Sequence, residues 1–273
     1  MKTFLARRWL LSLVTTALAV GLGLAWQLGR VALLSVAVYS GWLLLFLVLV
    51  LTFFNARKKL PFLPLLSASA WMQAHIYLGW LGCLVFVLHT GVRLPDGRLE
   101  VLLSAVFAVV AASGALGLWL SRWLPPRLVR SGESLVYERI PVLRHQLAEE
   151  VRELVRRAET ETQSSTLADL YLRVLHPYFL RVPPLLTPLT GDDREFHRVK
   201  QELESARRYL NPDELKLAGE LADLIEAKRN LDLQLAGQRL LKLWLFVHIP
   251  LTYGMLVLTA AHVWLALHYS HRL

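Results

Sequence analysis

Residues Trp71–Val92 read WMQAHIYLGWLGCLVFVLHTGV and contain no Asp, Glu, Lys or Arg. Residues Leu243–His271, LWLFVHIPLTYGMLVLTAAHVWLALHYSH, contain none either. Each stretch is long enough to cross a hydrocarbon core of ~30 Å as a helix that rises ~1.5 Å per residue. Each also carries two histidines away from its ends, separated in both cases by fourteen residues: His75 and His89, and His248 and His262.

Three further runs, Trp9–Gly29, Val31–Ala56 and Val101–Ser121, also lack those four charged residue types. The 273-residue chain is 55% hydrophobic, and its mean hydropathy is +0.43. None of the five runs alternates with the period of a strand, and backbone polar groups cannot stay unpaired in lipid. The sequence therefore predicts an all-α, polytopic membrane protein with five transmembrane helices.

The first run resembles a signal peptide, because basic residues precede it and it contains Ala17-Leu-Ala19. Its apolar stretch continues well past that point to Gly29, so we expect the helix to be retained. Basic residues near the span ends predict orientation. They are more numerous on the side that carries the N-terminus, which predicts a multi-pass protein of the cell (inner) membrane with its N-terminus cytoplasmic and its C-terminus outside. The basic residues on that side are Lys2, Arg7, Arg8, Arg57, Lys58, Lys59, Arg122, Arg127, Arg239 and Lys242.

These spans divide the chain into residues 1–123 with four helices, a cytoplasmic insert at 124–238, and residues 239–273 with the fifth helix. Residues 122–239 hold 19 Lys and Arg and 19 Asp and Glu, so the net charge of +9 comes from residues that flank the spans. A nucleic-acid-binding domain would instead carry a basic face of its own. Cys83 is the single cysteine, which excludes iron–sulfur clusters held by this chain alone and covalent CxxCH haem attachment.

The insert has apolar residues at three- and four-residue steps, which predicts helices. Pro183-Pro184 interrupts this pattern. Asn211-Pro212-Asp213-Glu214 is a typical helix start, with a capping Asn and Pro in the first position. We expect this helix to run almost directly into the fifth span, with a bend at Gly237. No glycine-rich phosphate loop occurs, so no nucleotide or flavin domain is predicted.

Fourteen residues are about 3.9 helical turns, so the two histidines of each helix lie on nearly the same face, ~21 Å apart. The third and fifth spans run in the same direction, because one span returns between them. This topology predicts that His75 meets His248 near one membrane surface and that His89 meets His262 near the other.

Histidines at such depth are costly in lipid and usually functional, although a single one can simply bond a neighbouring helix. One tetrahedral zinc ion needs its nitrogen ligands at ~2.0–2.1 Å, which the distance along each helix excludes for all four. Haem fits better, because the porphyrin supplies four nitrogens and two imidazoles complete the iron. Gly79, Gly82, Gly114 and Gly117 would let a planar group approach the backbone, and ordinary helix packing explains them equally well.

Over the second through fifth spans the chain resembles the transmembrane dihaem cytochrome b class, which includes respiratory cytochrome b subunits and the ferric-reductase-like membrane domain. The resemblance implies a four-helix bundle around two b-type haems, with His75, His89, His248 and His262 as axial ligands of iron. The chain departs from that class in two ways. It lacks a Pro-Glu-Trp-Tyr motif, and its insert is much longer than the usual short loop.

We therefore expect an electron-transfer subunit of an oxidoreductase complex, working between a membrane quinone and partner redox subunits that carry iron–sulfur centres or c-type cytochromes. Two alternatives remain open at this point. One is a haem-free transporter or proton relay that uses the histidines. The other is a membrane scaffold whose helical insert docks a partner.

Overall fold

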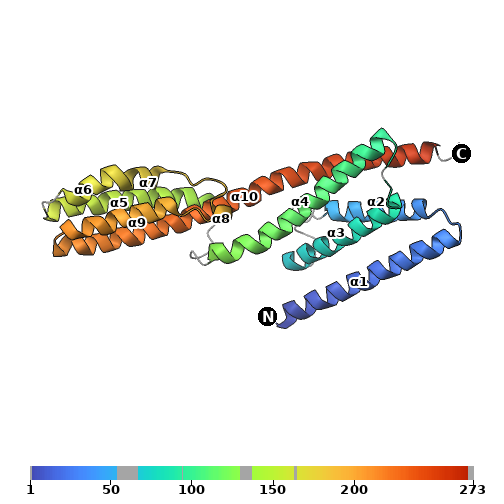
Figure 1. The fold of residues 1–273 in the computed structure, drawn as a ribbon, viewed down its shortest axis with the longest axis horizontal. Coiled ribbons are helices and arrows are strands. Elements are labelled where there is room, and N and C mark those ends of the chain that lie inside the picture. Colours follow the sequence, from blue (N-terminus) through green and yellow to red (C-terminus); the bar gives the residue numbers. More distant parts are fainter. Residues whose placement is uncertain (1, 54–66, 94, 130–136, 163–164, 270–273) are drawn as a thin grey trace. The chain divides into compact units, whose positions relative to one another are not determined.

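The computed structural model describes residues 2–53, 67–93, 95–129, 137–162 and 165–269 (Figure 1). Every element assigned within these ranges is a helix, and none is a strand. The ends of the expected second and fifth spans, residues 54–56 and 270–271, lie outside the described residues, as do Arg57, Lys58 and Lys59. The prediction of an all-helical fold is confirmed for the described part of the chain.

Five of the described helices are long and apolar enough to cross a membrane. They are α1 (Lys2–Val31), α2 (Val36–Phe53), α3 (Ala68–Thr90), α4 (Arg98–Val129) and α10 (Pro212–Tyr269). Large apolar side chains such as Trp9, Leu13 and Phe46 are exposed on them. Such a surface is stable against lipid and unstable against water. The described part of the chain is therefore all-helical and has five candidate membrane-spanning helices, which is what the apolar runs predict.

The chain divides into two compact units, which are described separately. Unit 1 comprises residues 1–118 and 245–273, and unit 2 comprises residues 119–244. The predicted insert, residues 124–238, falls within unit 2. Helix α10 is continuous through Gly237, where a bend was expected, and through Pro250. The fifth apolar run is therefore the C-terminal half of a 58-residue helix.

In unit 1, α3 packs closely against α2 and α1. The small core of this unit consists of Leu47 from α2 and Leu81 and Val85 from α3. Trp26 of α1 also donates its indole N–H to the Leu88 carbonyl of α3, at 3.0 Å. Helix α3 ends at Gly91, whose φ of 61° is the left-handed conformation that closes a helix. These contacts fix α3, the helix that carries His75 and His89.

Unit 2 is built on the N-terminal half of α10, which begins with a reciprocal cap. Asn211 Oδ1 accepts hydrogen bonds from the backbone N–H of Asp213 and Glu214, and Glu214 Oε2 accepts one from the Asn211 N–H. The predicted helix start is therefore confirmed. Besides α10 and the C-terminal end of α4, the elements of unit 2 are η2 (Tyr137–Arg139), α5 (Ile140–Thr162), α6 (Thr166–Leu170), η3 (Tyr171–Leu175), α7 (His176–Leu180), α8 (Thr187–Thr190), α9 (Arg194–Ala206) and η4 (Arg207–Tyr209).

One apolar core holds these elements together. Its fully buried side chains come from α5, α6, η3, α9 and α10, among them Val151, Leu154, Leu167, Leu175, Leu203, Leu221 and Ile225. This core is separate from that of unit 1.

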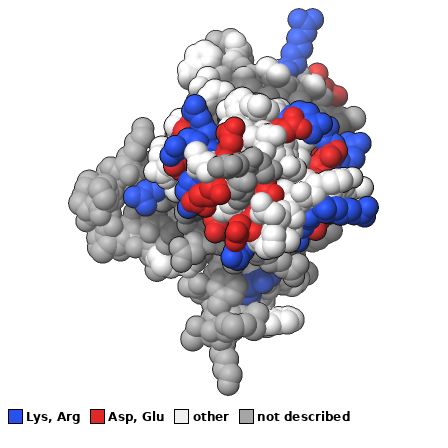
Figure 2. Space-filling model, turned by 90° about the vertical axis from the view of Figure 1, so that its left-hand side faces the viewer, with Lys and Arg blue, Asp and Glu red and all other residues white. Residues whose placement is uncertain are grey.

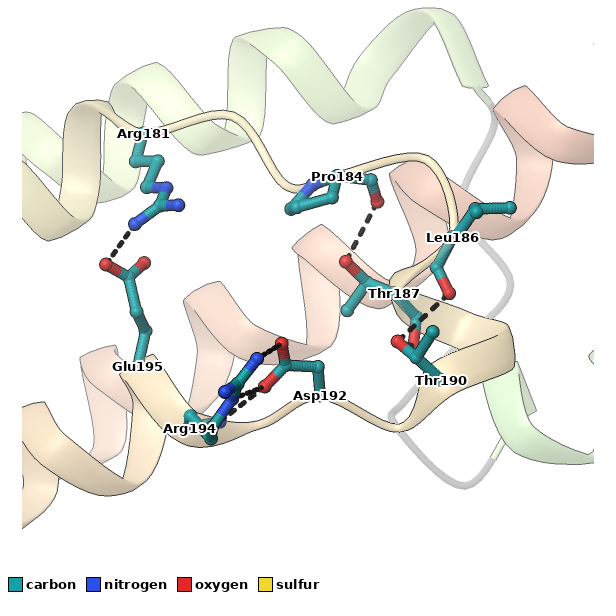
Figure 3. Close-up of polar contacts among 8 residues, drawn as sticks. All are labelled: Arg181, Pro184, Leu186, Thr187, Thr190, Asp192, Arg194 and Glu195. Atoms are coloured by element: carbon teal, nitrogen blue, oxygen red, sulfur yellow. Dashed lines mark hydrogen bonds and ion pairs between the residues drawn. The ribbon is translucent and has the colours of Figure 1, made fainter.

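The segment between α7 and α9 turns at the predicted Pro183-Pro184 interruption (Figure 3). Arg181 forms an ion pair with Glu195 across this segment. The Thr187 hydroxyl donates to the Pro184 carbonyl at 2.8 Å. Arg194 binds Asp192 through both side-chain oxygens and lowers the pKa of Asp192 to about 2. Local polar contacts therefore order a segment that has no long helix.

The surface of unit 2 carries both signs of charge. Figure 2 shows Lys and Arg intermixed with Asp and Glu on one face, without a basic patch. This mixture fits the equal numbers of acidic and basic residues in the sequence.

Candidate functional site

The four histidines that the sequence singles out within apolar runs all belong to unit 1. His75 and His89 lie on α3, and His248 and His262 lie on the C-terminal half of α10. All four side chains are half-buried. The fourteen-residue spacing on a continuous helix separates the two positions of each helix by ~21 Å.

The structure brings these histidines together in two pairs. The ring centroids of His89 and His262 are 6.4 Å apart, with their planes at 85°. His75 and His248 lie close enough for a charge on one to act on the other. His75 and His248, the first histidines of their helices, form one pair. His89 and His262, the second histidines, form the other. Such pairing requires α3 and α10 to run in the same direction.

The Nδ1 atom of His89 is held by helix α2. It lies 3.0 Å from the Ala37 carbonyl and 3.2 Å from the Ser40 hydroxyl. A carbonyl can only accept, so Nδ1 carries the proton and donates it. In the neutral ring Nε2 then has a free lone pair, which is the form that binds a metal.

His248 is held in a similar way by helix α4. Its Nδ1 lies 2.6 Å from the Ser113 hydroxyl oxygen, and that hydroxyl donates its own hydrogen to the Val110 carbonyl at 2.8 Å. The Ser113 oxygen is therefore left to accept from Nδ1–H. In that tautomer the ring lone pair of His248 is on Nε2.

A glycine follows each of these serines and lies against the same imidazole. A Cβ added at Gly41 would lie 3.0 Å from His89 Cε1, and one at Gly114 would lie 3.7 Å from His248 Cε1. Of the other glycines singled out in the sequence, Gly79 has nothing within 4 Å and Gly82 only a leucine methyl at 3.9 Å. The sequence interpretation missed Ser40, Gly41 and Ser113. The repeated Ser-Gly dipeptide within apolar runs, 40–41 and 113–114, is the signal that could have identified them.

His262 has a different neighbour behind its ring. Its Nδ1 lies 3.7 Å from Glu100 Oε1, and it is buried without a hydrogen-bond partner in the described part of the chain. Glu100 was considered in the sequence only as a charge that flanks a span, so its proximity to His262 was not predicted.

The His89–His262 geometry is compatible with two axial ligands of one metal. An imidazole nitrogen bound at ~2.0–2.1 Å, the length known for zinc, places the ring centroid roughly 3 Å from the metal. Two such rings on opposite sides therefore have centroids roughly 6 Å apart, close to the 6.4 Å found. The described residues include no group of three or more His, Cys, Asp or Glu that could hold a metal ion. A macrocycle that brings four nitrogens needs only two imidazoles from the protein.

The other described histidines are not part of either pair. His176 contacts Tyr171, His197 contacts Phe196, and His268 stacks on Trp264. Cys83 is half-buried in α3.

Comparisons with protein-family models, with curated proteins and with solved structures give no significant match. Any functional conclusion therefore rests on the residues and on their geometry.

Proposed function

We propose that this protein is a membrane electron-transfer subunit of the dihaem cytochrome b type. His75 and His248 would hold one b-type haem, and His89 and His262 would hold the other, within a bundle of α2, α3, α4 and α10. The single observation that carries the proposal is the His89–His262 pair. Its ring separation of 6.4 Å would let both imidazoles bind one iron, and His89 Nδ1 is already occupied by Ala37 and Ser40.

The protein's own residues would orient the ligands. Backbone and hydroxyl oxygens that accept from Nδ1 keep Nε2 available and restrict rotation of the ring, as outer partners of metal-bound histidines do. Gly41 and Gly114 leave room for the imidazoles beside their helices. When bound, haem iron supplies one-electron chemistry, and two protein ligands leave no open position for oxygen.

Two such sites ~21 Å apart along the helices would carry electrons between the two membrane surfaces. We place the protein in the cell (inner) membrane, with its N-terminus cytoplasmic and its C-terminus outside. Its expected partners are a quinone and redox subunits with iron–sulfur centres or c-type haem. Unit 2, with mixed charge on its surface, would be the cytoplasmic docking domain for such a subunit.

Haem content tests this proposal. The purified full-length protein should yield two non-covalent b-type haems per chain in a pyridine haemochrome assay. His75→Ala and His248→Ala should each remove one spectral component, and His89→Ala and His262→Ala should each remove the other. Cross-pairing would require ligands ~21 Å apart in depth to meet.

Two results would contradict the proposal. A protein purified without haem would leave the transporter and scaffold functions. Identical spectral losses in His75→Ala and His262→Ala would reject the predicted pairing.

A further inference from the structure

Glu100 occupies an unusual position at the start of α4. It is the third residue of this helix, and its side chain folds back over Gly97, the residue before the helix begins. A Cβ added at Gly97 would lie 1.8 Å from Glu100 Oε2, so only glycine leaves room for the carboxylate in this position. The other carboxylate oxygen, Oε1, lies 3.7 Å from His262 Nδ1.

With Nε2 bound to iron as proposed, Nδ1 of His262 carries the ring proton and needs an acceptor. It is buried and has no hydrogen-bond partner among the described residues. A buried N–H without an acceptor destabilises the folded state. The Glu100 carboxylate is the acceptor at hand, and a movement of less than 1 Å would bring 3.7 Å to the ~2.7–2.9 Å of a charge-assisted hydrogen bond.

The acceptors behind the candidate ligands therefore differ in charge. His89 has a carbonyl and a hydroxyl, and His248 has a hydroxyl, all of them neutral. His262 alone of these three has a carboxylate. A carboxylate behind a metal-bound imidazole makes the ring a more basic ligand and stabilises the more positive state of the metal.

We propose that Glu100 is a positioning residue for His262 and lowers the reduction potential of the haem held by His89 and His262. The inference rests on the proposed function. It adds that the two haems differ in potential partly because of one carboxylate. A competing explanation is that Glu100 only caps α4, as a Glu or Gln in the third helical position often does.

Redox titration of full-length Glu100→Gln separates these explanations, because Gln keeps the length of the side chain and can still cap the helix. Loss of an outer-shell partner typically changes metal binding 10- to 100-fold. We expect the haem of the His89–His262 pair to become about tenfold easier to reduce, an upward shift of about 59 mV for a one-electron couple. The haem of the His75–His248 pair should keep its potential. In electron paramagnetic resonance, only the low-spin ferric signal of the His89–His262 haem should shift.

Two further variants control for charge and for folding. Asp96→Asn removes an exposed acid from the same connection between α3 and α4 and should leave both potentials unchanged. Gly97→Ala retains Glu100 but displaces its carboxylate, so it should shift the same haem in the same direction as Glu100→Gln.

Unchanged potentials in Glu100→Gln would mean that Glu100 only caps the helix. Equal shifts of both haem potentials, or a shift in Asp96→Asn, would mean that charge acts in a general way and not through His262. Either result overturns the inference. If Glu100→Gln loses haem altogether, Gly97→Ala decides, and unchanged potentials there overturn the inference. Wild-type protein without haem would instead reject the proposed function.

Discussion

Gly41 is the residue at which the smallest change reaches a candidate ligand. It lies on α2, and a single added methyl group would come to 3.0 Å from His89 Cε1. Contacts that short force a neighbour to move, and a densely packed interior transmits the displacement. We therefore expect Gly41→Ala to displace the His89 ring from its position beside Ala37 and Ser40 and to weaken one of the two spectral components. Haem content and the reduced absorption spectrum measure this effect.

Gly23→Ala is the matched control, because Gly23 also lies within an apolar helix, α1, outside the proposed bundle, and nothing lies within 4 Å of its added Cβ. It should keep two haems and the wild-type spectrum. If both alanine variants behaved alike, the close approach of Gly41 to His89 would have no consequence for the site.

At the scale of elements, a buried group of charges joins α10 to α5 and α7. Lys228 is only 2% exposed, forms an ion pair with Asp232, and lies 4.2 Å from the centre of the Tyr178 ring. Arg144 Nε lies 2.8 Å from Asp232 Oδ1, an ion pair without the alignment of a hydrogen bond. Burial lowers the pKa of Lys228 and raises that of Asp232, because desolvation disfavours the charged form of each group, while their mutual attraction acts in the opposite direction.

Asp232→Ala should destabilise unit 2 strongly, because it leaves Lys228 and Arg144 buried without their carboxylate. Breaking a buried ion pair by removing one partner costs about 3–5 kcal/mol. The rate of protease cleavage within residues 119–244 of the full-length protein in membranes is the measurement. Glu153→Ala breaks the exposed pair with Arg156 and should leave that rate unchanged. Equal rates in the two variants would show that the buried group contributes little.

At the scale of the whole molecule, the two units are connected by continuous helices and not by loops. The boundaries at residues 118/119 and 244/245 fall inside α4 and α10. The candidate haem ligands all belong to unit 1, whereas unit 2 has its own apolar core. This division allows haem binding and partner docking to be tested separately.

Replacing residues 124–238 with a short flexible linker should preserve two haems per chain. It should slow electron exchange with the partner on the cytoplasmic side, because the proposed docking domain is removed. Haem content and the exchange rate are measured on the same preparation. Exchange at the wild-type rate would mean that the insert serves only as a connection between two helices.

The sequence by itself was sufficient for the all-helical fold of the described residues, for five helices long and apolar enough to cross a membrane, and for the helix start at Pro212. These depend on hydrophobicity, helix capping and the absence of charge, which are local properties of the chain. The fourteen-residue spacing also predicted which histidines would lie near one another. In a helix, the number of residues between two positions determines the face on which each side chain lies and the distance between them along the axis. That either pair binds haem stays a prediction.

Only the tertiary structure decided which residues contact the Nδ1 atoms of the candidate histidine ligands. Ser40 is 49 residues from His89, and Ser113 is 135 residues from His248. Such contacts depend on how each helix is rotated about its axis, which hydrophobic runs leave undetermined because they are apolar on every side. The same reason explains why Glu100 could be counted as a flanking charge in the sequence and yet lies beside His262 in the structure.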